Sequence, residues 1–282
     1  MAVKFVIDSA SDVLPEEAKA LGVYHCPLKV LFGEEEYADA VDMTHKEFYE
    51  KLTAEDVLPT TSQVPPADFM AAFEEITEAG DVAIAITISS KLSGTYQSAM
   101  VAADGYEGKV FVIDSRTVTA GERILLMRGL ELAKQGLAAE EIVAQLEEEK
   151  DRVRLVALVD TLEYLKKGGR VSPAVAFAGG LLSIKPVIAV EDGVVVMAGK
   201  ARGAKQGNNL LRELASNGGG IDFERPVCLA YSGLSDDAVK KFKEENAEFW
   251  QGHENEISIA SVGCVIGTHA GPGAVAVVYF EK

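Results

Sequence analysis

Apolar runs alternate with amphipathic helical patterns through the first half of the chain. Three runs indicate buried strands over residues 3–7, 82–88 and 109–113, and a looser alternation over 24–32 indicates one more. Helical patterns lie between and after them, over residues 15–21, 45–52, 66–77, 118–135 and 139–149. One more helical pattern follows the polar turn over residues 89–97 and ends at residue 103. Thr44 and Glu47 have the spacing of a capping box at the start of the second of these helices. Strands that alternate with helices predict a parallel sheet flanked by helices.

The second half of the chain has a different pattern. It predicts strands over residues 154–159, 186–190, 194–198, 226–231, 256–261 and 274–280, and helices over 161–167, 173–182, 203–215 and 235–249. Asp192 and Gly193 are typical of a β-hairpin turn, and hairpins mixed with helices predict a mixed sheet. We therefore predict an α/β protein of two domains. Residues 1–152 form an α/β/α parallel-sheet, Rossmann-like domain, and residues 153–282 form an α+β mixed-sheet domain.

Strands of the predicted parallel sheet end in polar turns that precede helices. These turns are Asp8-Ser9, Ser89-Ser90 with Ser93, and Asp114-Ser115. Because the carboxyl ends of parallel strands meet at one edge of a sheet, the three turns are expected to lie together. Helix N-termini at that edge also offer free amides, so the sequence predicts a site for a small anion there.

The charge of the chain excludes several classes of partner. Its formal net charge is −17 over 282 residues, which argues against nucleic acid and against anionic membranes, since both need a basic face. No run of about 18 apolar residues is present, so we expect no stable membrane insertion. The three cysteines lack CxxC spacing and the N-terminus lacks a secretory apolar region, which predicts a cytoplasmic protein.

A glycine-rich stretch over residues 263–273 surrounds Thr268 and His269. Glycine lets a ligand approach the main chain closely, so a loop that presents His269 to a ligand is one interpretation. A plain turn between two strands, with the histidine bonded to a local carbonyl, is the other. The four histidines are dispersed along the chain, so we expect no metal site.

Hydrogen-bond donors near these turns suit a small carboxylate. Ser93 precedes a helix, Thr61 and Ser62 lie between prolines, and His269 lies among glycines. Simpler structural roles are an N-cap for Ser93 and a turn hydroxyl for Thr61. A serine-type acyl-ester hydrolase, with Ser93 as nucleophile and His269 as base, is the alternative from another class of protein.

Two further features permit either a structural or a functional interpretation. The predicted helix over residues 173–182 is apolar nearly all round, so it either packs against a sheet or forms the wall of an apolar tunnel. Basic residues are scarce in this chain. Arg170 and Arg202, both near glycines, are candidates for recognising an anionic group or an acidic partner surface.

Taken in order along the whole chain, several short motifs resemble those of the DegV family. They are Asp8-Ser9-Ala10-Ser11-Asp12, Thr61-Ser62-Gln63, Leu92-Ser93-Gly94-Thr95-Tyr96-Gln97-Ser98-Ala99, Asp114-Ser115, Leu165-Lys166-Lys167-Gly168-Gly169-Arg170, Lys185-Pro186 and Ile266-Gly267-Thr268-His269-Ala270-Gly271-Pro272-Gly273. Each motif alone is weak, but their combination in this order is specific. The helix before Lys185 is richer in alanine than the family pattern, which leaves the preferred acyl chain length open.

The resemblance implies a bacterial cytoplasmic fatty-acid-binding protein of two α/β domains. A long-chain fatty acid would lie in a buried tunnel, with its carboxylate near the domain junction. The resemblance also implies a lipid-binding subunit of a fatty acid kinase. A separate ATP-binding subunit would phosphorylate the carboxylate, and the acyl-phosphate would feed phospholipid synthesis. No catalytic residue and no cofactor are then expected in this chain, which lacks a loop for ATP phosphates.

Carried over position by position, the resemblance assigns roles to individual residues. The carboxylate contacts fall on Thr61, Ser62, Ser93, Gly94, Thr268 and His269. The residues assigned to the acyl tunnel are Phe177, Leu181, Leu182 and Ile266. Arg170 and Arg202 are the candidates for engaging the kinase subunit.

Overall fold

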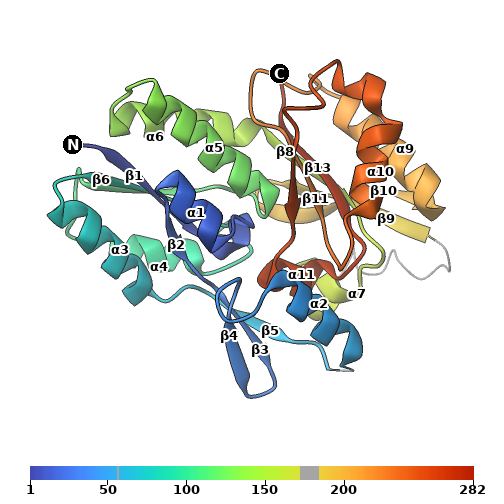
Figure 1. Cartoon of the computed structure of the whole chain (residues 1–282), viewed down its shortest axis with the longest axis horizontal. Helices are drawn as coiled ribbons and strands as arrows, with labels where there is room; N and C mark the ends of the chain where they lie inside the picture. Colours follow the sequence, from blue (N-terminus) through green and yellow to red (C-terminus); the bar gives the residue numbers. More distant parts are fainter. Residues whose placement is uncertain (56, 172–183) are drawn as a thin grey trace.

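The computed structural model describes residues 1–55, 57–171 and 184–282, and Figure 1 shows their arrangement. The first half contains a four-stranded sheet in the order β2-β1-β6-β7, in which neighbouring strands are parallel. Its strands are β1 Val3–Asp8, β2 Tyr24–Cys26, β6 Val82–Thr87 and β7 Val110–Asp114. The predicted parallel sheet is thus confirmed.

Helices cover both faces of this sheet. They are α1 Pro15–Leu21, α3 Pro66–Glu78, α4 Thr95–Ala102, α5 Ala120–Lys134 and α6 Ala139–Glu149, and a 3-10 turn, η1, spans Ser9–Ser11. α3 and α4 pack together on one face, and α5 and α6 pack together on the other (Figure 1). These helices lie where the sequence predicts them, because proline begins α1 and α3 and apolar residues recur at helical spacing.

The second half forms a six-stranded mixed sheet in the order β10-β9-β8-β13-β11-β12. Its strands are β8 Val153–Leu158, β9 Ile184–Glu191, β10 Val194–Arg202, β11 Cys228–Tyr231, β12 Ser258–Ser261 and β13 Val275–Phe280. β11 and β12 pair in parallel, and the other neighbours are antiparallel. Two helices, α9 Gly203–Ser216 and α10 Asp237–Glu245, pack against one face. The predicted mixed sheet is confirmed, and a domain boundary at residue 152 stays a prediction.

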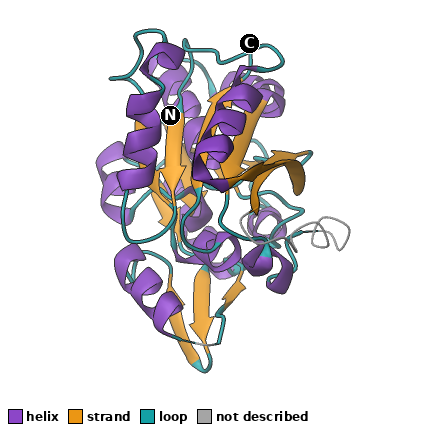
Figure 2. Ribbon diagram, turned by 90° about the vertical axis from the view of Figure 1, so that its right-hand side faces the viewer, coloured by secondary structure: helices purple, strands orange, loops and turns teal. Residues whose placement is uncertain are grey.

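The structure also contains a small third sheet that the sequence analysis did not predict. β3 Lys29–Phe32 pairs antiparallel with β4 Glu35–Ala38 and with β5 Thr60–Ser62. Figure 2 shows this sheet below the two larger ones. The single strand predicted over residues 24–32 is wrong. Pro27 offers no N–H to a strand ladder, and the chain passes there from the parallel sheet to the small one.

Helix α2, His45–Ala54, follows the hairpin of β3 and β4. The capping box predicted for its first turn is confirmed. The Glu47 amide donates to Thr44 Oγ1 at 3.3 Å, and the Thr44 amide donates to Glu47 Oε2 at 2.9 Å. These two bonds satisfy amides that a helix start otherwise leaves unpaired.

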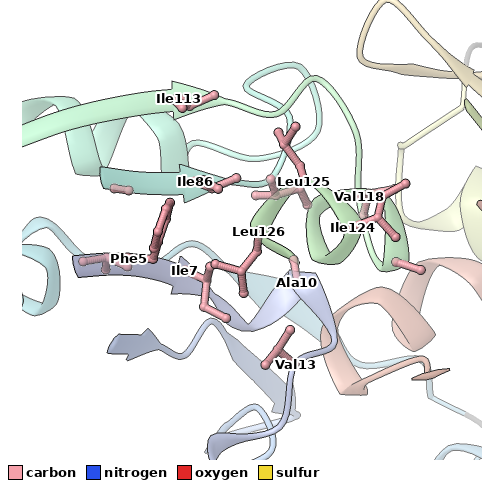
Figure 3. Packing of buried hydrophobic residues seen from close by; sticks show 14 of the residues in the cluster. Phe5, Ile7, Ala10, Val13, Ile86, Ile113, Val118, Ile124, Leu125 and Leu126 are labelled. Carbon is pink, nitrogen blue, oxygen red and sulfur yellow. The ribbon is translucent and has the colours of Figure 1, made fainter. Parts of the chain in front are cut away.

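Helix α5 belongs to the cores of both large sheets. It contacts β1 and β6 of the parallel sheet and β8, β11 and β13 of the mixed sheet. Figure 3 shows Leu125 and Leu126 of this helix among Phe5, Ile7 and Ile86 of the parallel sheet. Buried side chains of both sheets form one contiguous cluster around α5, so the two halves of the chain share a core.

The glycine-rich stretch over residues 263–273 contains a short helix, α11, Cys264–Ala270, so the predictions of a loop or a turn are wrong. Its first amides donate to buried aspartates more than 200 residues away. The sequence of residues 263–273 alone therefore does not show which groups stabilise this helix. Gly267 in its middle permits close packing, since a Cβ there would lie 2.6 Å from the Tyr49 hydroxyl oxygen.

The other helices of the second half show three outcomes. α7, Glu163–Lys167, lies within the predicted range. The helix predicted over 235–249 is interrupted after α10, where the Asn246 side chain donates to Phe242 O at 2.7 Å. The helix predicted over 173–182 lies outside the described residues. Within the described part of the chain, no helix is long and apolar enough to cross a membrane.

Candidate ligand-binding site

A cavity of about 310 Å³ lies between the mixed sheet and the turns at the carboxyl ends of the parallel strands. Most of the side chains that line it are apolar. They are Leu28, Ile88, Leu92, Val118, Leu155, Ala157, Val159, Leu165, Ile188, Val190, Val195, Ala230, Val262, Val265, Ile266, Ala270, Ala274 and Ala276. A concave, mainly apolar cavity of this size is typical of sites for small molecules.

One face of the mixed sheet forms the floor of the cavity. Side chains alternate along a strand, so Ala157 of β8 lines the cavity while its neighbour Val156 lies on the face that packs against α9. Backbone pairing places Ala157 opposite Ala276 of β13, and Ala276 opposite Ala230 of β11. We call these three residues the alanine row. Their methyl groups leave space that larger side chains would fill.

A polar cluster interrupts the apolar lining. Thr61 Oγ1 lies 3.0 Å from His269 Nε2, and this pair joins β5 to α11 across 208 positions of sequence. Ser62, Ser93 and Gly94 line the same cavity. The structure therefore brings together five of the six residues to which the resemblance assigns carboxylate contacts.

Ser93 lies in the turn after β6, just before α4. Ser93 Oγ lies 2.9 Å from Thr95 Oγ1, and the Thr95 amide donates to Ser93 Oγ at 3.3 Å. Gly94 is the N-cap residue of α4, so the N-cap role predicted for Ser93 is wrong, and Ser93 lines the cavity. A side chain at the next residue would displace the Gln63 side chain, because a Cβ at Gly94 would lie 2.0 Å from Gln63 Oε1.

The polar turns of the parallel sheet lie together, as the sequence predicts. Asp8 Oδ2 accepts from the Ile88 amide at 2.9 Å, and Asp114 Oδ1 accepts from the Ser90 amide at 3.1 Å. Each bond joins the ends of neighbouring strands. Among the residues that the structure describes, no group of three or more His, Cys, Asp and Glu side chains is arranged to hold a metal ion.

Close packing and burial determine the state of His269. A Cβ at Gly168 would lie 2.1 Å from His269 Nδ1, so glycine is required beside the ring. Burial, and to a smaller extent the nearby positive charge of Arg170, together lower the pKa of His269 to about 4. The imidazole is therefore neutral near pH 7 and has a single N–H to donate. Nδ1 has no hydrogen-bond partner in the described ranges, and Nε2 faces Thr61.

The two arginines assigned to partner docking lie in different surroundings. Arg170 is half-buried and lines the cavity, and it donates from Nε to Leu92 O at 3.2 Å and from Nη1 to Gly168 O at 2.6 Å. Arg202 is exposed at the end of β10, where its amide donates to Gln206 Oε1 at 3.1 Å. Arg170 therefore places a positive charge in the polar cluster, and Arg202 does not.

Thr268 does not line the cavity. Its buried hydroxyl donates to Cys264 O at 2.9 Å within α11. Consecutive side chains of an α-helix point about 100° apart, so Thr268 turns away where His269 faces the cavity. Ile266 does line the cavity. The other residues assigned to the tunnel lie outside the described ranges, namely Phe177, Leu181 and Leu182.

The hydrolase alternative has no support in this geometry. Ser93 Oγ bonds to Thr95, and His269 Nε2 bonds to Thr61. Within the described residues, the two side chains do not form the hydrogen-bonded nucleophile and base that such a mechanism needs.

Most of the apolar residues that line the cavity were not predicted from the sequence. One signal could have found its floor, because alanine recurs at inward positions 157, 230 and 276 of three different strands. Leu28 and Val118 carry no such signal. They lie in loops, and only the tertiary fold brings them to the cavity.

Fold and cavity define the class of this protein: an α/β protein that encloses a mainly apolar cavity with a polar cluster in its wall. A family model described as an uncharacterised protein of the DegV family matches residues 2–282. The chain therefore belongs to the DegV family.

Its relatives match over nearly their whole length. A DegV domain-containing protein of Caldanaerobacter subterraneus subsp. tengcongensis is 38% identical over 283 residues, with 99% of each chain covered. A DegV family protein from Thermus thermophilus, described by its fatty acid binding, has a TM-score of 0.88, 33% identity and 100% of both chains covered. A stearic-acid-binding protein from Eubacterium ventriosum has a TM-score of 0.88 and 28% identity, with 100% of this chain and 99% of that chain covered.

Proposed function

We propose that this chain binds a long-chain fatty acid in the cavity. The acyl chain would lie along the alanine row, and the carboxylate would lie at the polar cluster. One observation carries the proposal: a mainly apolar cavity contains the bonded pair of Thr61 and His269 together with Ser93. Two relatives with the same fold are described as binding fatty acids, which supports the same ligand class here.

The apolar wall would supply most of the affinity. Burial of a methylene group contributes about 0.8 kcal/mol, so a chain of a dozen or more carbons has ample driving force. A carboxylate buried without partners would offset this gain. In the proposed complex its hydrogen bonds come from Thr61, Ser62, Ser93, the Gly94 amide and His269, and the Arg170 charge attracts it.

We also propose the partner that the family resemblance implies, a separate ATP-binding kinase subunit that phosphorylates the bound carboxylate. The chain itself would then be a non-catalytic lipid-binding subunit in the cytoplasm. Arg202 is exposed and Arg170 lies beside the polar cluster, which supports their assignment to an acidic partner surface. The site would lie at the junction of the two proposed domains, because Thr61 and His269 come from different halves of the chain.

The test of ligand binding is direct. The purified full-length protein is incubated with stearic acid, separated from free lipid and extracted with organic solvent, and the extract is analysed by mass spectrometry. We expect about one fatty acid per chain. His269→Ala should weaken binding about 10- to 100-fold, because it removes a hydrogen bond to a charged group.

The matched control is His253→Ala. His253 is stacked on Phe223 outside the cavity, so this variant should bind stearic acid as the wild type does. If no fatty acid is recovered from the wild-type protein, before or after incubation, the proposed function is wrong.

A further inference from the structure

Two buried aspartates hold the N-terminal end of α11. Asp12 Oδ1 accepts a hydrogen bond from the Gly263 amide at 2.8 Å. Asp39 accepts two, from the Cys264 amide at 2.9 Å and from the Val265 amide at 3.3 Å. Three consecutive amides at the start of the helix are therefore satisfied by side chains from the first half of the chain, where α11 itself has no capping side chain.

Both aspartates are themselves held in place. Thr119 Oγ1 donates to Asp12 Oδ2, and Ser9 Oγ donates to Asp39 Oδ2 at 3.1 Å. The same Ser9 hydroxyl oxygen accepts from the Leu28 amide at 3.0 Å. Thr119 and Leu28 both line the cavity. A continuous chain of hydrogen bonds thus connects α11 to two parts of the cavity wall.

The remainder of α11 allows little adjustment. Gly267 packs so closely that a Cβ would lie 2.6 Å from the Tyr49 hydroxyl oxygen and 2.7 Å from a Phe48 ring carbon. A seven-residue helix is about 10 Å long, so a shift of its first turn tilts its last turn as well. That last turn carries His269, whose Nε2 lies 3.0 Å from Thr61 Oγ1.

We propose that Asp12 and Asp39 are positioning residues for ligand recognition, because they hold α11 so that His269 meets the ligand carboxylate beside Thr61. This inference rests on the proposed function. Neither aspartate lines the cavity. Their effect on binding therefore passes through His269, and this distinguishes them from residues that contact the ligand.

A double-mutant cycle on the full-length protein tests whether the aspartates act on binding through His269. Asp39→Asn keeps the size of the side chain but replaces one acceptor oxygen with a donor. Binding of stearic acid to the delipidated protein is measured by titration calorimetry. Asp39→Asn should weaken binding about tenfold in the wild-type background, and hardly at all in the His269→Ala background. Equal weakening in both backgrounds would overturn the inference, since the aspartate would then act independently of the histidine.

Glu149→Gln is the matched control. Glu149 is also buried, but its carboxyl oxygens accept from the Arg128 side chain, and it does not line the cavity. This variant should lower the melting temperature while the dissociation constant stays within twofold. A Glu149→Gln effect on binding as large as that of Asp39→Asn would also overturn the inference. Should Asp39→Asn fail to fold, Asp12→Asn enters the same cycle with the same expected result.

A second readout reports on the carboxylate itself. The ¹³C chemical shift of stearic acid labelled at its carboxyl carbon should move in Asp39→Asn toward its value in His269→Ala, and should not move in Glu149→Gln. An unchanged shift in Asp39→Asn would count against the positioning role while leaving the proposed function intact. A wild-type protein that binds no stearic acid would overturn both.

Discussion

The buried carboxyl groups of this chain differ in their surroundings. Asp12 and Asp39 accept hydrogen bonds from backbone amides, which offset the cost of their burial. Glu122, in the first turn of α5, is fully buried, and neither of its side-chain oxygens has a hydrogen-bond partner among the described residues. Burial raises the pKa of Glu122 well above its ordinary value, and the nearby Asp8 and Asp12 carboxyls raise it further. Glu122 therefore lowers the stability of the folded state at any pH at which its carboxyl group loses the proton.

Glu122→Gln should stabilise the protein in a pH-dependent way. A carboxyl with a raised pKa binds its proton more tightly in the folded state, so wild-type stability falls as the pH rises above the pKa of the unfolded chain. The amide does not titrate. We expect the advantage of the variant to be smallest near pH 4, close to the pKa of a glutamate in the unfolded chain, and to grow toward pH 8 by about 1.4 kcal/mol per pH unit while the folded carboxyl stays protonated, measured by urea unfolding. Glu74→Gln, at an exposed position of α3, is the control, and a gain independent of pH would contradict this account.

Among the secondary-structure elements, the strands of the mixed sheet have different neighbours on their two faces. One face packs against α9 and α10, and the other faces the cavity. The alternation of side chains along each strand separates the two roles, so a substitution on one face leaves the other face nearly unchanged. The alanine row is the clearest case, because three small residues from three strands meet at one place on the cavity side.

Ala276→Val should change which acyl chains bind. Two added methyl groups would protrude from the alanine row into the cavity and shorten the space for the chain. We expect affinity for stearic acid to fall about tenfold, and affinity for a chain some four carbons shorter to fall less, which competition binding would measure. Ala189→Val places the same change on the opposite face of the sheet, where β9 packs against α9. It should destabilise the fold without changing the order of chain-length preference. If Ala276→Val lost equal affinity for both chain lengths, the proposed role of the alanine row would be contradicted.

At the scale of the whole molecule, the cavity and the core belong to both halves of the chain. α5 contacts both large sheets, and the pair of Thr61 and His269 spans the two halves. A ligand in the cavity would therefore contact elements that are far apart in sequence. Because such a site exists only in the folded molecule, binding adds directly to the stability of the folded state.

Stearic acid should therefore raise the melting temperature of the delipidated protein in a concentration-dependent way. At a free concentration one hundred times the dissociation constant, the gain in unfolding free energy is about 2.7 kcal/mol. Differential scanning calorimetry would measure it as a rise of several degrees. Methyl stearate, which lacks the carboxylate, should raise the melting temperature less. An equal rise with the ester would show that the polar cluster takes no part in recognition.

Regular elements of this fold could be predicted because their signals are local. Proline at the first turn of α1 and α3, the capping box of α2 and the apolar strands β1 and β6 all depend on residues close together in sequence. The gathering of polar turns at one sheet edge followed from the parallel order of the strands alone. Ser93 and Thr61 could be named as candidates on these grounds, together with the motifs that resemble the DegV family.

Other features depend on partners that no local pattern specifies. The glycines of residues 263–273 predict a loop or a turn, yet the chain forms α11 there, and Asp12 and Asp39 satisfy its first amides from the other half of the chain. The neutral state of His269 follows from burial, and its place beside Thr61 follows from the packing of α11. The residue types and their order were enough to predict an α/β protein with a set of candidate donors. Only the tertiary structure decided which of those donors share one cavity, because hydrogen bonds and packing between distant segments place them there.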